Sequence, residues 1–231
     1  MAGMSSFTCI APDTLTVCTY AYFAPFSHVV DGRVVGSDIS TLERFAWSHG
    51  YEVRFDVTDF PNIWERPGRG ECDIAAAGIA ALSQRDPGSG ARWSVPYAVV
   101  RRSLLVRRSE VDSLRSPRDF AGRTIVVTES STADIDARVR YAPIGANIVA
   151  ALPAQEEMVR RLLDGEIDAY AGGDRSNLYL AASEPRVALV DVHPFEPPET
   201  LHFAVRHTDP RLLEALNEFV INDRDSTAES S

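Results

Sequence analysis

The sequence predicts an α/β protein with two mainly parallel sheets covered by helices, arranged as two lobes joined by a two-strand hinge. Three observations lead to this fold class. Apolar segments typical of strands alternate with segments of helical periodicity from the start of the chain. The alternation stops near residue 100 and starts again near residue 124. The chain also crosses between the two sections twice, near 98–106 and near 193–200, as expected of a hinge.

The first section alternates strands with one clear helix. Its expected strands span residues 15–20, 51–56 and 73–79. A turn is expected over 23–27. The helix over 39–49 is predicted from apolar residues that share one face, namely Ile39, Leu42, Phe45 and Ala46. Asp38 is placed to cap the start of this helix and Gly50 to end it.

The second section repeats the pattern, and the chain then returns to the first. Strands are expected over 124–128 and 167–171, with a helix over 154–163 between them that Gly165 ends. The return begins with a strand over 201–206. A last helix starts at Pro210, capped by Asp209, with a buried stripe of Leu212, Leu213, Leu216, Phe219 and Val220. The polar tail over 222–231 is expected to fray.

These elements predict a discontinuous first lobe, residues 1–100 and 200–231, and a second lobe over residues 101–199. The length of 231 residues is sufficient for two small lobes with their own cores. The apolar fraction of 45% and the charged fraction of 24% are ordinary for a globular protein.

The charge excludes some classes of partner and chemistry. A net charge of -10 argues against nucleic acid, because neutralising phosphates requires a basic surface. All 23 basic residues are arginine, so Schiff-base chemistry and lysine-dependent phosphate loops are excluded. The chain has no Walker loop, dinucleotide fingerprint, HExxH or GxSxG motif. We therefore expect no cofactor and no metal.

The cysteines and the start of the chain bear on its compartment. Cys9, Cys18 and Cys72 are dispersed, so we expect three inert thiols, with one disulfide as the alternative. The first residues lack the basic start and apolar core of an export signal, which predicts a cytoplasmic protein as written. An extracytoplasmic location is the alternative if the start has been processed or replaced. No apolar segment has the length of a membrane span.

An ordered series of short motifs carries a resemblance to a known family. The series includes Phe23-Ala24-Pro25-Phe26, Gly36-Ser37-Asp38, Asp59-Phe60, Cys72-Asp73-Ile74-Ala75-Ala76-Ala77-Gly78-Ile79, Ser83-Gln84-Arg85, Trp93-Ser94-Val95-Pro96-Tyr97, Asp119-Phe120-Ala121-Gly122-Arg123-Thr124, Gly165-Glu166-Ile167-Asp168-Ala169 and Asp209-Pro210-Arg211-Leu212-Leu213. In order and spacing it resembles family 3 of the bacterial extracellular solute-binding proteins, which serve amino-acid uptake. The resemblance runs from Leu15 to Val220 and implies the type II periplasmic-binding-protein fold, with a ligand cleft between the lobes.

The resemblance implies a set of ligand-binding residues in the first lobe. Arg85 matches the arginine that holds the ligand carboxylate, a role that suits a guanidinium because its fork meets both carboxylate oxygens. Phe23 and Phe60 match aromatic walls, although both could be ordinary core residues. Gly78 follows the end of a strand, where a missing side chain lets backbone groups approach a ligand.

The second lobe is expected to complete the site. Ser130, Ser131 and Thr132 lie between a strand and a helix, where hydroxyl and N–H groups can bind a carboxylate. Helix capping is the alternative role for these residues. Asp174 resembles the acid that receives the ligand's amino group, at a spacing one residue too long.

Several positions depart from the family pattern, and two of them belong to the expected ligand site. Ala80 stands where a threonine usually helps to hold the carboxylate, and Tyr20 stands where many members have a small or acidic residue. A lost hydrogen bond to a charged group weakens binding by roughly 1.5–3 kcal/mol. The ligand is therefore expected to be a small carboxylate-bearing molecule, an amino acid or a derivative.

The sequence is compatible with three functions. The first is ligand binding, with a transporter or sensor as partner if the chain is exported. The second is a cytoplasmic lyase resembling cyclohexadienyl dehydratase, for which Glu129, Asp174 and His193 are the candidate general acids. The third is a domain retained for protein contacts, and no amphipathic stripe beyond the core faces supports it.

Overall fold

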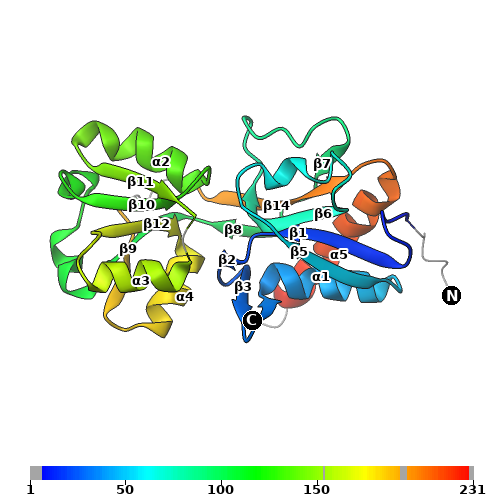
Figure 1. Ribbon diagram of the computed structural model, residues 1–231, viewed down its shortest axis with the longest axis horizontal. Coiled ribbons are helices and arrows are strands. Elements are labelled where there is room, and N and C mark those ends of the chain that lie inside the picture. The colour runs from blue at the N-terminus through cyan, green and yellow to red at the C-terminus, as the bar shows by residue number, and fades with distance from the viewer. Residues whose placement is uncertain (1–6, 153, 193–196, 229–231) are drawn as a thin grey trace. The chain divides into compact units, whose positions relative to one another are not determined.

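The computed structural model describes residues 7–152, 154–192 and 197–228. By its internal contacts the chain divides into two compact units (Figure 1). The first unit contains residues 1–21, 26–99 and 200–231, and the second contains residues 22–25 and 100–199. The segment Tyr22–Pro25 thus belongs to the second unit, although its neighbours along the chain belong to the first.

The first unit is built on one sheet with strand order β5-β1-β6-β14-β7, and β8 also pairs with β14. β1 pairs in parallel with β5 and β6, whereas β14 runs antiparallel to β6 and β7. The strands are β1 (Thr14–Thr19), β5 (Glu52–Val57), β6 (Ile74–Ala80), β7 (Ala91–Trp93), β8 (Ala98–Val100) and β14 (Glu199–Arg206). A separate hairpin joins β3 (Ser27–Val30) to β4 (Arg33–Val35).

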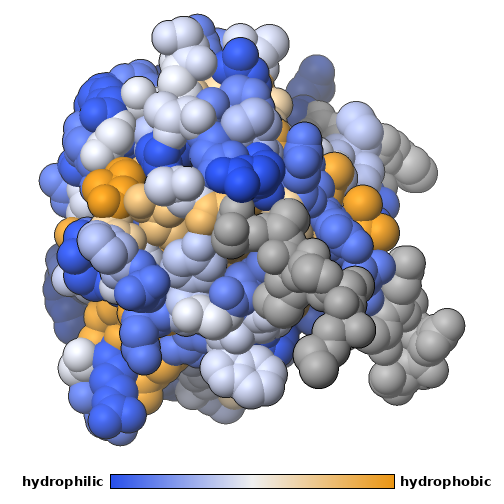
Figure 2. All heavy atoms as spheres, turned by 90° about the vertical axis from the view of Figure 1, so that its right-hand side faces the viewer, coloured by the Kyte–Doolittle hydropathy of each residue, from blue (hydrophilic) through white to orange (hydrophobic). Residues whose placement is uncertain are grey.

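Two helices, α1 (Ser37–Ser48) and α5 (Pro210–Ala228), supply apolar faces to the first unit (Figure 1). The predicted stripes are confirmed, since the same residues enter one core cluster with β1, β6 and β14, namely Leu42, Phe45, Leu212, Leu216 and Val220. A short 3-10 helix, η1 (Ile63–Glu65), precedes β6. Figure 2 shows that the end face of this unit is mostly hydrophilic, with apolar side chains in small separate areas.

The second unit has a five-stranded sheet of order β11-β10-β12-β9-β13, in which β9 runs antiparallel to β12 and β13. Its strands are β2 (Tyr22–Phe23), β9 (Arg102–Arg107), β10 (Thr124–Thr128), β11 (Asn147–Ala151), β12 (Ala169–Gly173) and β13 (Val187–Val190), of which β2 lies outside this sheet. The helices are α2 (Thr132–Arg140), α3 (Gln155–Leu163) and α4 (Asp174–Ser183), with 3-10 turns η2 (Arg108–Ser113), η3 (Pro117–Phe120) and η4 (Ala142–Ile144).

Helices cover both faces of this second sheet (Figure 1). α2 packs with one core cluster through Ala133 and Ala137. α3 and α4 pack with the other through Met158, Leu162 and Leu180. Helices on both faces explain why β10 is a continuous apolar run, as parallel strands buried on both sides require.

Two local expectations prove wrong because tertiary contacts decide them. Asp38 does not cap α1, since the cap position is Gly36 and Asp38 lies inside the first turn, fully buried. The tail does not fray at residue 222, because α5 continues to Ala228. Arg44 on α1 pairs with Asp223 on α5 at 2.7 Å, a contact between helices far apart in the sequence.

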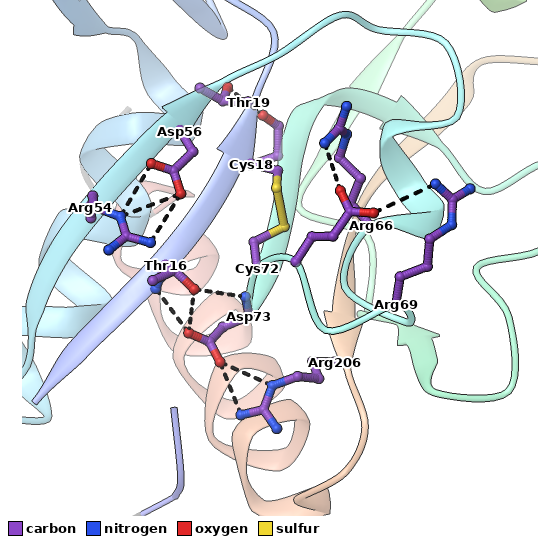
Figure 3. The surroundings of a disulfide bond; sticks show 12 residues. Thr16, Cys18, Thr19, Arg54, Asp56, Arg66, Arg69, Cys72, Asp73 and Arg206 are labelled. Atoms are coloured by element: carbon purple, nitrogen blue, oxygen red, sulfur yellow. Dashed lines mark hydrogen bonds and ion pairs between the residues drawn. A yellow bond between two sulfur atoms is a disulfide. The ribbon is translucent and has the colours of Figure 1, made fainter. Parts of the chain in front are cut away.

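The expectation of three thiols is also wrong, since Cys18 and Cys72 form a disulfide (Figure 3). The two residues are 54 positions apart, and the parallel pairing of β1 with β6 brings them together. Beside them, the buried carboxylate of Asp73 accepts the Thr16 hydroxyl at 2.7 Å and pairs with Arg206 at 2.9 Å. Cys9 stays a free thiol, and burial raises its pKa to about 12.

Candidate functional site

Arg85 lies in a buried cluster of aromatic residues in the first unit. Only 4% of its surface is exposed, and its guanidinium carbon lies 4.8 Å from the centre of the Trp64 ring and 5.7 Å from that of Phe60. Phe60 in turn makes edge contacts with Trp64 and Tyr20, at centroid distances of 6.1 and 5.9 Å. The cluster is a cation held against ring faces, an arrangement that gains in strength as water is excluded.

The end of β6 orients the Arg85 side chain. Ala80 closes this strand, and its carbonyl accepts a hydrogen bond from Nη1 of Arg85 at 3.0 Å. The Arg85 N–H meanwhile closes a turn onto the Leu82 carbonyl at 2.9 Å. A backbone carbonyl and two aromatic rings therefore contact the guanidinium and orient it within the first unit. Ala80 contributes through its backbone, and its methyl side chain is buried.

Gly78 occupies the same strand two residues earlier, with a left-handed φ of 60°. This conformation favours glycine because a Cβ would meet the backbone. The Gly78 N–H donates a hydrogen bond to Oδ2 of Asp38 at 2.9 Å, and the Tyr97 hydroxyl donates to the same oxygen at 2.8 Å. Burial raises the pKa of Asp38 to about 7, and these two hydrogen bonds oppose the rise.

The structure thus brings together five residues predicted for the site within the first unit: Tyr20, Phe60, Gly78, Ala80 and Arg85. Their role in ligand binding stays a prediction. Phe23 lies on β2 and is partly buried, and the division of the chain assigns it to the second unit.

The three hydroxyl residues of the second unit surround the start of α2. Ser131 is the helix cap, since its side-chain oxygen accepts the Asp134 N–H at 3.2 Å, so the capping alternative is confirmed for this residue. Ser130 has a left-handed φ of 61° and donates its N–H to the Asp134 carboxylate at 3.1 Å. Thr132 is the first residue of the helix. All three are partly exposed.

Asp174 begins α4, and backbone groups engage its carboxylate. One oxygen accepts N–H groups from Arg101 at 3.1 Å and from Arg175 at 2.8 Å. The Asp174 N–H also bonds to the Arg101 carbonyl at 2.8 Å, so the residue ties α4 to the start of β9. Glu129 is exposed just after β10. His193 lies outside the described residues.

A second polar cluster lies within the second unit, and no sequence motif pointed to it. The buried Gln155 accepts the Ala24 N–H at 2.7 Å and donates to the Ser176 hydroxyl at 2.7 Å. Ser176 bonds in turn to the Ala24 carbonyl. These contacts attach the Tyr22–Pro25 segment to α3 and α4.

The sequence also contained no indication that Trp64, Asp38 and Tyr97 contact the candidate site residues. Trp64 lies on a short 3-10 turn with no periodic pattern, and Asp38 looked like a helix cap. The motif Gly36-Ser37-Asp38 was visible in the sequence. The hydrogen bond between Asp38 and Gly78 was not, because these residues are 40 positions apart.

No membrane-crossing helix, long and apolar enough for that role, occurs within the described part of the chain. Among the same residues, no group of three or more His, Cys, Asp or Glu side chains is arranged to hold a metal ion.

Comparison with known proteins identifies a family. The family described as bacterial extracellular solute-binding proteins, family 3, matches residues 15–227. Among curated proteins, none is significantly similar to the chain in sequence.

Solved structures agree with this match. The amino-acid ABC transporter substrate-binding protein AbpA from Streptococcus pneumoniae, bound to L-arginine, has a TM-score of 0.83 at 22% identity, over 93% of this chain and 90% of that one. An ancestral arginine-binding protein bound to arginine has a TM-score of 0.80 at 25% identity, over 94% and 96%. The ancestral amino-acid-binding protein AncCDT-1, a precursor of cyclohexadienyl dehydratase, has a TM-score of 0.82 at 26% identity, over 94% and 93%. The predicted fold class, the type II periplasmic-binding-protein fold, is confirmed.

Proposed function

This chain belongs to family 3 of the bacterial extracellular solute-binding proteins, and from that membership we propose that it binds an amino acid or a derivative through Arg85. One observation carries the proposal. The Arg85 guanidinium is held between the Ala80 carbonyl and the rings of Trp64 and Phe60, in the part of the first unit where β6 ends. A guanidinium oriented in this way meets both oxygens of a carboxylate with little loss of side-chain freedom.

The surroundings of Arg85 favour a ligand with an apolar or aromatic portion beside its carboxylate. Tyr20 and Phe60 supply ring surface, and Ala80 supplies a methyl group instead of a hydroxyl. The missing hydroxyl removes one hydrogen bond to the carboxylate, so affinity is expected to fall about one to two orders of magnitude below that of a site with both groups.

The second unit contributes the second part of the proposed site. Ser130, Ser131 and Thr132 stand at the start of α2, where partial positive charge favours a carboxylate. The Asp174 carboxylate remains the proposed acceptor for the ligand's amino group. One of its oxygens already accepts hydrogen bonds from the backbone N–H groups of Arg101 and Arg175. Closure of a cleft between the units by hinge motion is part of the proposal.

We further propose an ABC transporter as the partner, since AbpA is described as the substrate-binding protein of one. The Cys18–Cys72 disulfide favours an extracytoplasmic location, because such bonds persist in oxidising compartments.

Isothermal titration of the purified protein tests the ligand proposal, after unfolding and refolding to release any retained ligand. The titrants are the twenty common L-amino acids and small cyclic acids. For the titrant that binds most tightly, Arg85→Lys is expected to weaken binding about tenfold to a hundredfold, because an ammonium group cannot make two parallel hydrogen bonds to a carboxylate.

The matched control is Arg69→Lys, an exchange of the same kind at a side chain in the same unit that is 52% exposed and pairs with Glu65. It should leave affinity unchanged. Absence of heat with every titrant would count against the proposal, as would equal affinity in the Arg85→Lys variant and the wild type.

A lyase is the second candidate, and the likeness to AncCDT-1, at 26% identity, is the observation that favours it. Incubation with prephenate and arogenate, followed by ultraviolet absorbance, separates the two functions. A binding protein leaves both acids unchanged, whereas a lyase converts one of them. Glu129→Gln and Asp174→Asn would then identify the general acid among the described candidates.

A further inference from the structure

Asp38 is a buried acid that neither the helix cap nor the proposed ligand contacts account for. Its residue surface is 0% exposed, and Oδ2 accepts both the Gly78 N–H and the Tyr97 hydroxyl. The other oxygen, Oδ1, is buried and has no hydrogen-bond partner among the described residues. A carboxyl group held by one oxygen only is costly to bury in its charged form.

A short path connects this carboxyl group to Arg85. Gly78 and Ala80 are two residues apart on β6, a separation of at most about 6.6 Å, the value for extended backbone. The Gly78 N–H binds Asp38, and the Ala80 carbonyl binds Nη1 of Arg85. One strand segment therefore holds the acid at one end and the carboxylate clamp at the other.

We infer that Asp38 is a positioning residue of the ligand site. It fixes the end of β6, which binds Arg85, and its charge state sets the affinity for a carboxylate ligand. The effect of the Asp38 charge on ligand affinity rests on the proposed function. The hydrogen bond between the Gly78 N–H and Asp38 does not depend on any ligand.

Burial, and not a neighbouring charge, governs the titration of Asp38. The shift of its pKa to about 7 comes from desolvation, opposed by the Gly78 and Tyr97 hydrogen bonds. The charged and titratable residues on α1 and on the elements that pack against it are the following: Glu43 and Arg44 on α1, His28 on β3, Arg33 on β4, Glu52, Arg54 and Asp56 on β5, and Arg211, Glu214, Glu218, Asp223 and Arg224 among the described side chains of α5. None of them is a cause of the shift.

The direction of the effect follows from charge. A carboxylate held by Arg85 lies on the order of 10 Å from Asp38, given the strand spacing and one hydrogen bond at each end. Ionised Asp38 repels that carboxylate, whereas the neutral acid does not. By reciprocity, ligand binding also favours the protonated form of Asp38. Affinity is therefore expected to fall about threefold to tenfold as pH rises through 7.

Asp38→Asn is the decisive variant. Both hydrogen bonds go to one oxygen, so an amide oxygen in the place of Oδ2 keeps both bonds and removes the titration. The affinity of this variant should be constant from pH 5.5 to 8.0. The probe in the titrations is L-arginine, replaced by the tightest-binding amino acid of the panel if that is a different one. Asp56→Asn, at a side chain of the same unit that is 45% exposed, should keep the wild-type profile.

Tyr97→Phe supplies a second, independent variant. It keeps the ring that stacks on Phe203 at 4.1 Å and removes the hydroxyl that lowers the pKa of Asp38. The midpoint of the affinity profile should therefore move to higher pH. An unmoved midpoint would contradict the role of Tyr97, and an Asp38→Asn profile that matches the wild type would overturn the inference.

A ligand-free measurement separates this inference from the proposed function. The Gly78 backbone amide, followed by nuclear magnetic resonance, should titrate near pH 7 in the wild type and not in Asp38→Asn. A Gly78 amide that does not titrate overturns the inference. If the Gly78 amide titrates but the protein binds none of the titrated amino acids and cyclic acids, the proposed function is overturned, and the effect of Asp38 on affinity is overturned with it. The positioning of Gly78 by Asp38 would still be supported.

Discussion

At the scale of single residues, the first unit buries both the carboxyl group of Asp38 and the guanidinium of Arg85. Arg85 is stabilised by ring faces and one carbonyl, and Asp38 by one N–H and one hydroxyl. Both side chains are more than nine-tenths buried. Burial of ionisable groups next to a strand end is costly, and such groups cluster at sites where function requires them.

The buried acid predicts how stability changes with pH. Because the folded-state pKa of Asp38 is raised from 3.8 to about 7, the folded protein keeps a proton that the unfolded chain loses. The stabilising effect of this proton is complete below about pH 4 and is lost as pH rises to 7. Relative to Asp38→Asn, the free energy of unfolding of the wild type should fall by about 3 kcal/mol between pH 5 and pH 8.

Urea unfolding of both proteins at the two pH values measures this difference. Asp56→Asn is the control, because its carboxylate is exposed, and it should follow the wild type. Equal pH dependence in the wild type and Asp38→Asn would contradict the assignment of a raised pKa to Asp38.

At the scale of elements, the disulfide joins two neighbouring strands of the first sheet. Cys18 is on β1, and Cys72 lies two residues before β6 begins (Figure 3). The same pair of strands is bound by the contact of Thr16 with Asp73, so covalent and polar links reinforce one register. The strand that ends at the candidate site is therefore anchored at its beginning.

Removal of this bond should destabilise the protein. The bond closes a loop across 54 residues of sequence separation, and the loss of that constraint on the unfolded chain costs about 4 kcal/mol in the chain-entropy account. Urea unfolding with and without a reductant tests the prediction. Cys9→Ser, which leaves the bond intact, should retain the full response to the reductant, whereas Cys18→Ala with Cys72→Ala should show none. An unchanged midpoint on reduction of the wild type would contradict a stabilising bond.

At the scale of the whole molecule, the chain forms two units, each with its own sheet and core. The chain passes from one unit to the other at Val99–Val100 and Glu199–Thr200, and also on both sides of Tyr22–Pro25. Gln155 and Ser176 attach that last segment to the second unit. The two units are therefore joined by several segments of chain.

The proposed closure predicts a linked pair of ligand effects. Saturating ligand should decrease the radius of gyration measured by small-angle X-ray scattering. It should also stabilise the fold, by about 2.7 kcal/mol at a concentration of a hundred times Kd. Arg85→Lys at the same ligand concentration should show smaller changes in both. A bound ligand that stabilises the protein without reducing the radius of gyration would contradict closure while leaving binding intact.

Much of the fold could be predicted because periodicity is a local property. The apolar stripes of α1 and α5 and the continuous run of β10 each lie within a few turns of chain, and the structure places them as expected. The helix cap at Ser131 was predicted only as the alternative to ligand binding, and it was visible in the sequence because a cap acts over three residues. The family was identifiable because its motifs keep their order and spacing along the chain.

The sequence by itself therefore determined the fold class, the order of most elements and the family. Only the tertiary structure decided the neighbours of the candidate site and the pairing of the cysteines. Trp64 beneath Arg85, Gly78 beside Asp38 and Cys18 bonded to Cys72 join positions 21, 40 and 54 residues apart. The physical reason is that burial and strand pairing set the chemistry of these side chains, and neither is encoded within a short stretch of chain.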